Sequence, residues 1–477
     1  METIASKLVN QLHGLPASDI PPRVHARAAL CMEDTLGVAL AALASGAGTA
    51  GVALARQAGP GRVSVWGAGL GAPLSDAVLA NGMLAHALDF DDLHAAAVMH
   101  SSAAIVPTAL GLAQHLGASP REMLAAAIVG YEVAARLGRL APGRFQLHGF
   151  QSTSVLGTFA TTSVAARLLG LDAAQALHAF GIAGSMAAGS MEFLADGSSV
   201  KQMHPGWAAS AGIKAAQLAK AGFTGPATVF EGRFGIFRSY ARAEVDASRI
   251  DARIGEPWEV ELMGPKPYPA CLCVHPQVQA MLQLREAGSI AAERWDDIEE
   301  IACEVPDLYV PLVYEPRERK LNVQTAYEAR FSAPYCMARA LLDGHLDNGS
   351  FDAAQRADPI ARAIASRVTW KVAALPEYPA SFPARVRVTL RGGRVHEAYV
   401  RHNLGSPANP MDEAQLGAKF LACAEPAVGR SAARRLHLAL RALPDAQDMD
   451  RFNAALAAAL LPETHDGHES QRPASAG

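Results

Sequence analysis

A short run of His and Asp residues carries the densest acid–base chemistry in the sequence. The segment HALDFDDLH at 86–94 holds three carboxylates within four residues, and His100 follows six residues later. Like charges this close repel, which favours a raised pKa on one carboxylate and a role as acid or base. Two other interpretations stay open: Asp91 and Asp92 are solvated or cap a helix, or the cluster ligates Zn²⁺ or Mn²⁺. No HExxH or comparable spacing supports the metal site.

A lysine and a histidine precede an expected helix start. Lys201 and His204 stand before Pro205, and proline is favoured at the first position of a helix. We therefore expect both side chains beside free backbone N–H groups, an arrangement that attracts a carboxylate. The alternative is an exposed lysine and a histidine that only caps the helix.

A second lysine lies in a rigid segment, KPYP at 266–269. The two prolines fix an extended backbone that presents Lys266 accurately. A lysine in a dry cleft can pair with a substrate carboxylate, or lose its proton and act as a base. Cys271 and Cys273 follow as a lone CxC pair, a weak signal for a soft metal, and we expect them to pack or to line the site.

Composition and short motifs exclude several functional classes. The 477 residues carry 42 basic and 46 acidic side chains, without the basic excess of a nucleic-acid-binding protein. No run of 18 strongly apolar residues predicts a membrane span, and the N-terminal segment lacks the apolar core of a signal peptide. The six cysteines form no CxxC pair, so we expect reduced thiols and a cytoplasmic protein. A GxSxG elbow and a phosphate loop are also lacking.

The elements that must position these residues fall into two groups. Helical patterns fill residues 1–245 and 412–461, whereas the residues between them hold several short β-branched runs typical of strands. The expected strands are 299–306, 366–372, 384–393 and 396–402. We predict a mainly α fold with an inserted α+β part. Its parts are an all-helical domain (1–265 and 404–461), a smaller α+β lid domain (266–403) and a disordered tail (462–477).

Six motifs in this order resemble the MmgE/PrpD family, which includes 2-methylcitrate dehydratase, cis-aconitate decarboxylase and iminodisuccinate epimerase. They are HALDFDDLH, MHSSAAIVP, GFQSTSVLG, GSSVKQMHPGWAA, KPYPACLCVH and EARFSAPYCMA. The resemblance implies a large helical domain with an α+β lid, a site in the cleft between them, and a homodimer. It also implies that no metal, iron–sulfur cluster or organic cofactor takes part.

The resemblance further implies which residues line a polycarboxylate site. Asp89 matches the first aspartate of the family's DFDDT motif, and His100 matches the histidine of its HPS motif. Lys201 matches the lysine before HPG, Lys266 matches that of K-x-[YF]-P, and Tyr335 matches the aromatic residue of FS-x-x-Y. These five residues are the expected catalytic group.

Four further residues are expected substrate contacts, and two of them depart from the family pattern. His204 and His275 lie within the matching motifs, Leu93 stands where the family often has Thr, and Gln151 stands where it often has His. A glutamine can hydrogen-bond but cannot shuttle a proton at neutral pH. The proline of HPS is here Ser101. The substrate therefore stays undetermined.

The chemistry that the resemblance implies is removal of a proton α to a carboxylate, or its reverse. Lys201 and Lys266 would stabilise the enolate-like charge, while His100 would transfer the proton. Asp89 would orient His100 or hold a substrate hydroxyl, and Tyr335 would donate a hydrogen bond or protonate a leaving group.

We expect a cofactor-free lyase that dehydrates a 2-methylcitrate-like di- or tricarboxylate. The alternatives are a cis-aconitate-type decarboxylase, an iminodisuccinate-type epimerase, and a homologue that binds an acid without turning it over.

Overall fold

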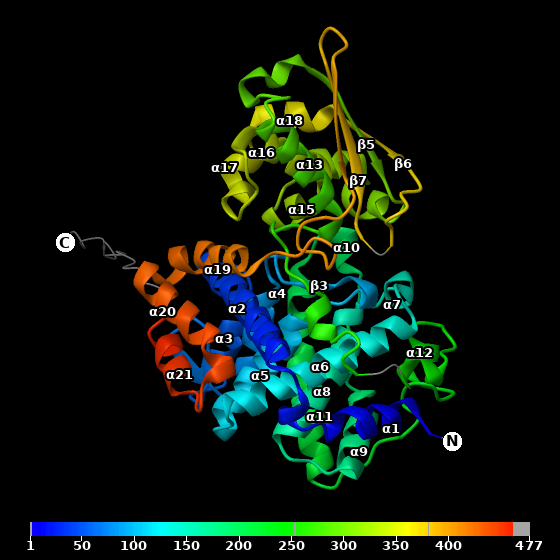
Figure 1. Ribbon diagram of the computed structural model, residues 1–477, viewed down its shortest axis with the longest axis vertical. Coiled ribbons are helices and arrows are strands. Elements are labelled where there is room, and N and C mark those ends of the chain that lie inside the picture. Colours follow the sequence, from blue (N-terminus) through cyan, green and yellow to red (C-terminus); the bar gives the residue numbers. More distant parts are fainter. Residues whose placement is uncertain (1, 252–253, 380, 461–477) are drawn as a thin grey trace, which may run out of the picture.

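The computed structural model describes residues 2–251, 254–379 and 381–460. The predicted disordered tail at 462–477 lies outside the described residues. A large body of helices carries both termini of the described chain, and a smaller domain with a sheet stands on it (Figure 1). The mainly α fold with a smaller α+β part is confirmed.

The helical domain is built from two separate stretches of chain, and Lys419 of α19 pairs with Asp34 of α2 at 2.6 Å across their junction. In Figure 1 the C-terminal helices lie beside α2. The helices are α1 (Ile4–Leu8), α2 (Pro22–Ala44), α3 (Thr49–Gln57), α4 (Leu74–His86), α5 (Ser102–Leu116), α6 (Pro120–Leu140), α7 (Arg144–Leu147), α8 (Ser152–Leu168), α9 (Ala173–Ala183), α10 (Phe193–Asp196), α11 (Met203–Lys220), α12 (Ile236–Ser239), α19 (Glu413–Val428), α20 (Arg430–Arg441) and α21 (Asp450–Ala457).

This domain is not entirely helical, because two short strand pairs belong to it. β1 (Val63–Val65) pairs with β2 (Leu70–Ala72), and β3 (Leu93–His94) pairs with β4 (Met263–Gly264), both antiparallel. Neither pair was predicted from the sequence, since each strand is only two or three residues long and carries no alternating pattern.

The lid domain contains a four-stranded sheet packed against helices, with strand order β6-β5-β7-β8. β5 runs parallel to β6 and antiparallel to β7, and β7 is antiparallel to β8. All four expected strands are present: β5 (Ile298–Val305), β6 (Val368–Val372), β7 (Ala384–Leu390) and β8 (Val395–Val400). The lid helices are α13 (His275–Glu286), α14 (Arg317–Leu321), α15 (Ala326–Arg330), α16 (Ala333–Asp343), α17 (Ala353–Arg356) and α18 (Pro359–Ser366).

Two hydrophobic cores divide the described chain. The core of the helical domain draws on residues from Ile4 to Met263 and again from Phe420 to Ala459. The core of the lid domain draws on residues from Ala270 to Val400. Ala, Leu and Val make up most of the larger core, as a chain with only 6% aromatic residues requires. The exact boundaries at 265/266 and 403/404 stay predictions.

Small residues let α11 approach α4 closely, and α11 follows the segment that carries Lys201. A Cβ added at Gly82 of α4 would lie 2.5 Å from the Cα of Gly206 in α11, so neither helix tolerates a side chain there. Contact at this distance fixes the start of α11 against the end of α4, where the His/Asp run begins.

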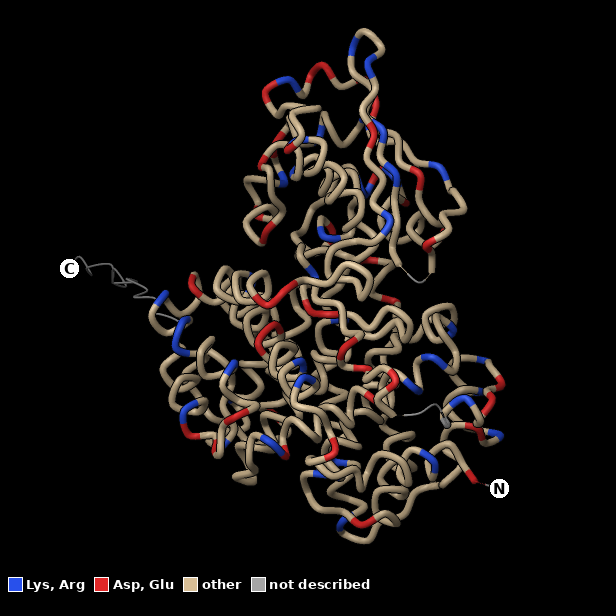
Figure 2. The backbone as a smooth tube through the Cα atoms, viewed as in Figure 1, with Lys and Arg blue, Asp and Glu red and all other residues tan. Residues whose placement is uncertain are grey.

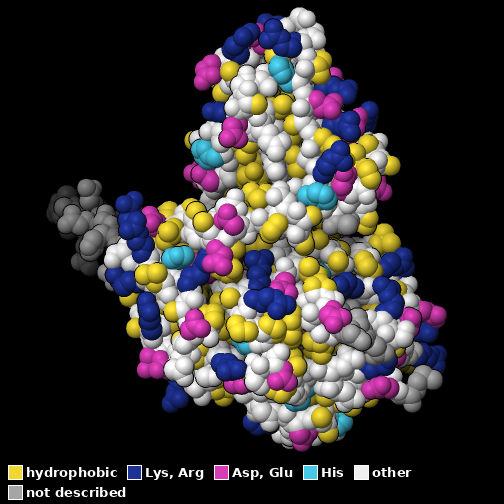
Figure 3. All heavy atoms as spheres, in the orientation of Figure 1, with side chains coloured by type: hydrophobic (Ala, Val, Ile, Leu, Met, Phe, Trp, Pro, Cys, Tyr) yellow, Lys and Arg dark blue, Asp and Glu magenta, His cyan; other side chains and the backbone are white. Residues whose placement is uncertain are grey.

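Positive, negative and apolar side chains are mixed on the face of the molecule that Figures 2 and 3 show. Lys, Arg, Asp and Glu are interspersed along both domains (Figure 2), and hydrophobic side chains lie between them on the visible face (Figure 3). Within the described residues, no single helix has the length and hydropathy of a membrane span. Only α2 and α3 taken together reach them, and these two helices meet at a bend of 87°.

Candidate active site

The short antiparallel pair β3–β4 joins the loop that carries Asp89 to the loop that carries Lys266. α4 ends at His86, and the chain then passes through the Asp run into β3, which pairs with β4. β4 ends two residues before Lys266, so the pairing brings Lys266 beside Asp89 from 177 residues away in sequence. Asp89 itself has a left-handed backbone with φ 51°, a conformation that aspartate tolerates better than most residues.

Asp89 binds both predicted lysines. Its Oδ1 accepts hydrogen bonds from Lys201 Nζ at 3.0 Å and from Lys266 Nζ at 2.9 Å, and Lys266 also donates to the Asp89 carbonyl at 2.8 Å. All three side chains are buried. Burial acts to raise the pKa of Asp89, but the two ammonium groups hold it well below its ordinary value. Two cations against one carboxylate give the Asp89–Lys201–Lys266 group itself a net positive charge, which suits an anionic ligand bound against the lysines.

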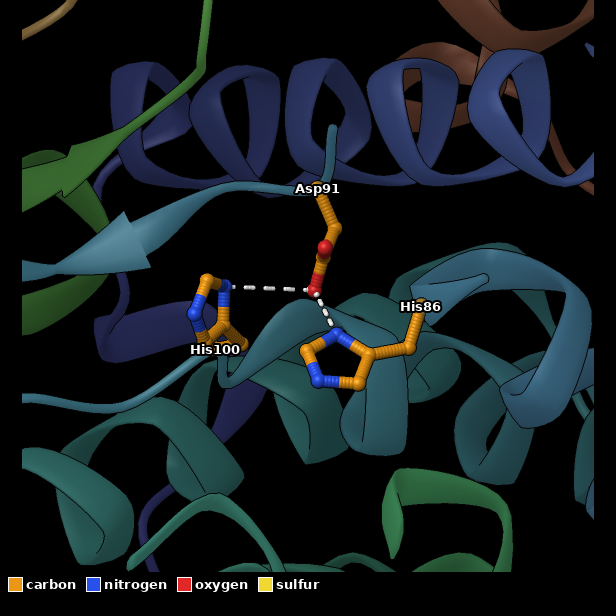
Figure 4. Close-up of side chains that lie close together, drawn as sticks. All are labelled: His86, Asp91 and His100. Atoms are coloured by element: carbon orange, nitrogen blue, oxygen red, sulfur yellow. Dashed lines mark hydrogen bonds and ion pairs between the residues drawn. The ribbon is translucent and has the colours of Figure 1, made fainter. Parts of the chain in front are cut away.

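Asp91 holds two imidazoles at once. Its Oδ2 lies 2.7 Å from His86 Nδ1 and 3.3 Å from His100 Nδ1, and the two rings meet edge to face 4.9 Å apart (Figure 4). Burial acts to raise the pKa of Asp91, but the two histidines hold it well below the usual range. We expected Asp89 to orient or polarise His100, or to hold a substrate hydroxyl. In the structure Asp91 is the carboxylate that bonds to His100, and Asp89 bonds to the two lysines.

The partners of His100 fix its tautomer. Its Nδ1 faces only acceptors, the Asp91 carboxylate and the Asp92 carbonyl at 2.9 Å, so Nδ1 carries the proton and Nε2 carries the lone pair. Burial, opposed by Asp91 and reinforced by Lys266, lowers the pKa of His100 to about 4. At neutral pH His100 is therefore a neutral imidazole whose Nε2 lone pair is free to accept a proton. Its side chain is 13% exposed, which leaves it open to a ligand.

Gln151 connects His86 to His204. Its Nε2 donates to His86 Nε2 at 3.4 Å, and its Oε1 accepts from His204 Nδ1, which leaves the lone pair of His204 on Nε2. Burial lowers the pKa of His204 to about 4. Gln151 thus contacts two histidines of the site. We expected His204 just before a helix, but α11 begins at Met203, so His204 lies in its first turn.

Asp92 is the one carboxylate of the run whose pKa rises. Burial raises it to about 7, and the side chain accepts a hydrogen bond from Ser102, whose hydroxyl lies 2.6 Å from Tyr131 OH. The sequence predicted a raised pKa on one of the three carboxylates from their mutual repulsion, and for Asp92 burial is the larger cause. Asp92 bonds within the helical core, however, and the lysines bond to Asp89.

Three other predicted residues, Tyr335, His275 and Leu93, make their contacts elsewhere. The Tyr335 hydroxyl donates a hydrogen bond to the Ser350 carbonyl at 2.6 Å within the lid core. We expected this hydroxyl to act on the substrate, but here its proton is already used in that bond. His275 Nε2 is 3.1 Å from the Ala270 carbonyl, so its imidazole supports the segment that follows Lys266. Leu93 is buried in β3.

A pocket between α10 and the lid domain lies next to this group, and sequence reasoning did not identify the residues that line it. Phe331 lines it, and Lys201 Nζ lies 5.1 Å from the centre of its ring. Phe193 lines it as well, and its ring meets that of His204 at 6.0 Å. Tyr327 lines it from α15. EARFS was a recognised motif, but nothing in its spacing marked Tyr327 or Phe331 as facing the cleft.

His86, Asp91 and His100 form a group that could hold a metal ion, since one ligand atom of each lies within 4.8 Å of the others. Both imidazoles, however, direct Nδ1 at the same carboxylate oxygen at hydrogen-bond distances of 2.7 and 3.3 Å. Zn²⁺ needs a nitrogen lone pair from each imidazole, whereas both Nδ1 atoms here carry a proton toward the Asp91 oxygen. The arrangement fits a hydrogen-bonded His–Asp–His triad better than a metal centre.

Comparisons with known proteins match nearly the whole chain. The MmgE/PrpD N-terminal domain matches residues 6–247, and the MmgE/PrpD C-terminal domain matches residues 268–445. Cis-aconitate decarboxylase of Homo sapiens is 28% identical over 481 aligned residues, which cover 97% of this chain and 96% of that protein. The protein of that name from Mus musculus is 27% identical, with 94% and 92% covered. That from Aspergillus terreus is 28% identical, with 47% and 48% covered.

Proposed function

The chain belongs to the MmgE/PrpD family, and from that premise we propose that it is an acid–base lyase acting on a di- or tricarboxylate. One observation carries the proposal: a buried, net-positive Asp89–Lys201–Lys266 group stands beside an imidazole that Asp91 orients. The cations supply attraction for an acid, and the imidazole supplies a group that can take or return a proton.

The residues divide the chemistry between binding and proton transfer. The ammonium groups of Lys201 and Lys266 bind a substrate carboxylate and stabilise the enolate-like anion that forms next to it. Asp89 keeps both ammonium groups in place. His100 transfers the proton through Nε2, while Asp91 accepts from its Nδ1 and stabilises the imidazolium that forms. A bound polyanion opposes the effect of Lys266, so the pKa of His100 rises when substrate binds.

Decarboxylation of a cis-aconitate-like acid is the first candidate reaction. Two relatives that cover more than nine-tenths of the chain carry the name cis-aconitate decarboxylase. A carboxylate that leaves as CO₂ is destabilised in an apolar environment, and Phe193, Leu194 and Phe331 line the adjoining pocket. The C–C bond breaks, CO₂ leaves, and the electrons of that bond pass into the conjugated acid. His100, which takes up a proton from solvent once the anionic substrate is bound, delivers that proton to carbon.

Dehydration of a 2-methylcitrate-like hydroxy acid is the second candidate. It begins with removal of a proton α to a carboxylate, and the unprotonated Nε2 of His100 is the base that this step needs. Leu93 and Gln151 stand where the family often has Thr and His, so a hydroxyl and an imidazole are missing here. Neither replacement can transfer a proton at neutral pH, and this difference affects which of the candidate acids the site can convert.

We also propose that the reaction needs neither metal nor organic cofactor, that the protein acts as a homodimer and that it works in the cytoplasm. What supports the first point is that lysine, histidine and carboxylate groups already provide charge stabilisation and proton transfer. The others rest on the family resemblance and the composition.

The test is incubation of the purified protein with cis-aconitate, 2-methylcitrate and iminodisuccinate in D₂O, with and without a chelator. Release of CO₂ identifies decarboxylation, loss of water identifies dehydration, and deuterium at carbon reports proton transfer. His100→Ala and Lys266→Ala should each lower turnover by at least about 10²-fold, whereas Lys214→Ala, an exposed lysine of α11, should not.

Three outcomes would contradict parts of the proposal. Full turnover in both active-site variants would show that the site is elsewhere. Loss of turnover with chelator would show that a metal takes part. Calorimetric binding of an acid without any exchange or reaction would support a non-catalytic homologue.

A further inference from the structure

A lysine from the C-terminal helices reaches the backbone of the aspartate run. Lys419 of α19 donates a hydrogen bond from Nζ to the carbonyl of Phe90 at 2.9 Å, across 329 residues of sequence. Its ammonium group also lies 4.0 Å from the centre of the Phe90 ring. Phe90 stands between Asp89 and Asp91, two carboxylates of the candidate site, so this lysine acts at the centre of the run.

The packing of two helices fixes where the Lys419 ammonium lies. Its Nζ forms an ion pair with Asp34 of α2 at 2.6 Å, and both side chains are buried. A Cβ added at Gly37 of α2 would lie 2.9 Å from Cδ2 of Phe420, so α2 and α19 pack in direct contact there. A buried ammonium group is costly unless charged and polar groups surround it. The Phe90 carbonyl and ring and the Asp34 carboxylate are those groups.

Two lysines from different parts of the chain hold consecutive carbonyls of the run. Lys266 donates to the Asp89 carbonyl at 2.8 Å, and Lys419 donates to that of Phe90. Asp89 has a left-handed backbone with φ 51°, a conformation that persists only where the surroundings hold it. The two bonds therefore clamp the turn that directs the Asp89 carboxylate toward two lysines and the Asp91 carboxylate toward two histidines.

The two lysines hold different parts of this turn. Lys266 bonds to the carboxylate of Asp89 as well as to its carbonyl. The Phe90 carbonyl belongs to the peptide unit that leads into Asp91, so the bond to Lys419 fixes the direction in which the Asp91 side chain leaves the backbone. Asp91 in turn lies 3.3 Å from Nδ1 of the proton-transferring histidine. Lys419 is therefore connected to proton transfer, whereas Lys266 is connected to the binding of an acid.

We propose that Lys419 is a positioning residue of the reaction: through the Phe90 carbonyl it holds Asp91 where this carboxylate orients His100. The inference rests on the proposed function and adds to it a residue that lies outside the six sequence motifs. It also gives the return of the chain to the helical domain a functional consequence, because α19 then supports the site as well as the core.

The experiment removes the buried ion pair as a whole, so that neither partner remains as a lone buried charge. Lys419→Met/Asp34→Asn is compared with Glu33→Gln/Arg441→Met, the matched control. Arg441 of α20 donates to the buried Glu33 of α2 at 2.6 Å, so the control pair joins the same two stretches of chain. The other bonds of Arg441 go to Glu413, not to the aspartate run.

Steady-state kcat and KM are measured on whichever of cis-aconitate, 2-methylcitrate and iminodisuccinate the wild type converts, and urea unfolding gives the stability of each variant. Both double variants should lose similar stability. Only Lys419→Met/Asp34→Asn should lower kcat, by at least about tenfold, because Asp91 no longer holds His100 in place. Lys419→Gln/Asp34→Asn, whose two amides can bond to each other, is a second version with the same expected loss, since glutamine is uncharged and one bond shorter than lysine.

Two further measurements separate positioning from a merely structural role. In Lys419→Met/Asp34→Asn, KM should change less than about threefold, since the lysines that bind the acid keep their contacts with Asp89. Asp34→Asn alone keeps the ammonium group and its bond to Phe90, so its kcat should stay within about threefold of the wild type.

Every other outcome overturns the inference. Unchanged kcat in both Lys419 variants, with turnover lost in His100→Ala, does so and leaves the proposed function standing. Equal loss of kcat in the control pair or in Asp34→Asn alone shows that the helix junction or the ion pair matters, and not the bond to Phe90. A rise in KM at unchanged kcat shows that Lys419 acts on the binding of the acid. A wild type that converts none of the three acids overturns the proposed function and this inference with it.

Discussion

Asp89, Asp91 and Asp92 stand within four residues and have three different environments. Asp89 lies between two ammonium groups, Asp91 between two imidazoles, and Asp92 against a serine in the helical core. Their pKa values accordingly move in opposite directions, down for the first two and up for the third. The sequence predicts that they must differ, because like charges this close cannot all be stabilised in the same way.

Which carboxylate does what could not be predicted, since the partners come from far along the chain. Lys201 and Lys266 are 112 and 177 residues from Asp89. The resemblance assigned both lysines and Asp89 to one site, and the structure brings the three into contact. It also offered Asp89 as the residue that orients His100 or holds a substrate hydroxyl, whereas Asp91 is the carboxylate that bonds to His100. It also gave Tyr335 a place beside the substrate, whereas the Tyr335 hydroxyl bonds to the Ser350 carbonyl within the lid core.

The raised pKa of Asp92 makes a prediction about stability. Between about pH 4 and pH 7 the folded protein keeps a proton on Asp92 that the unfolded chain releases, so its contribution to the free energy of unfolding falls as pH rises. The slope is at most about 1.4 kcal/mol per pH unit. Asp92→Asn removes it, so this variant should gain stability relative to the wild type as pH rises across that window.

Urea unfolding at pH 5 and pH 8 measures the effect. Asp445→Asn, at an exposed position, is the control and should keep the wild-type slope. A difference between Asp92→Asn and the wild type that is the same at both pH values would show that Asp92 is ionised in the folded protein throughout.

At the scale of elements, two features set the position of Lys266: the strand pair β3–β4, and Gly405, where the chain passes back from the lid domain to the helical domain. Gly405 has φ +90°, and a Cβ there would lie 2.0 Å from the Pro265 carbonyl oxygen, next to Lys266. Gly405→Ala should therefore displace Lys266 and lower kcat/KM by at least about tenfold, because a misplaced charge loses much of its stabilisation.

Gly392→Ala provides the matched control for this prediction. Gly392 has a similar φ of +86°, but nothing lies within 4 Å of an added Cβ. Both variants should lose about 1–2 kcal/mol of stability from the left-handed backbone, whereas only Gly405→Ala should lose activity. Equal kcat/KM in the two variants would show that Lys266 does not depend on this contact.

The long periodic elements were predictable and the very short ones were not. All four strands of the lid sheet follow β-branched alternating runs such as Val386 and Val388, whose side chains are buried on one face. β3 and β4 span two residues each, and no periodicity exists over that length. They form because the surrounding helices bring the two loops together.

At the scale of the whole molecule, low charge and exposed apolar residues bear on assembly. Charged residues make up 18% of the chain, and Phe234, Leu147 and Phe223 of the helical domain are 82%, 68% and 61% exposed. We predict that two copies of the chain associate, as the family resemblance implies, and that the contact covers part of this exposed apolar surface. Light scattering coupled to size exclusion should give twice the chain mass at micromolar concentration. A mass of one chain would contradict it.

The two crossings of the chain between domains lie side by side, since a Cβ on Gly264 would lie 2.7 Å from the Gly405 carbonyl oxygen. A segment whose ends meet can be exchanged as a cassette without breaking the core that receives it. Asp91 and His100 belong to the recipient, whereas Lys266 travels with the cassette. Exchange of the segment at this junction would therefore keep the residues of proton transfer and change those that bind the acid, so that evolution or protein engineering could alter substrate choice separately.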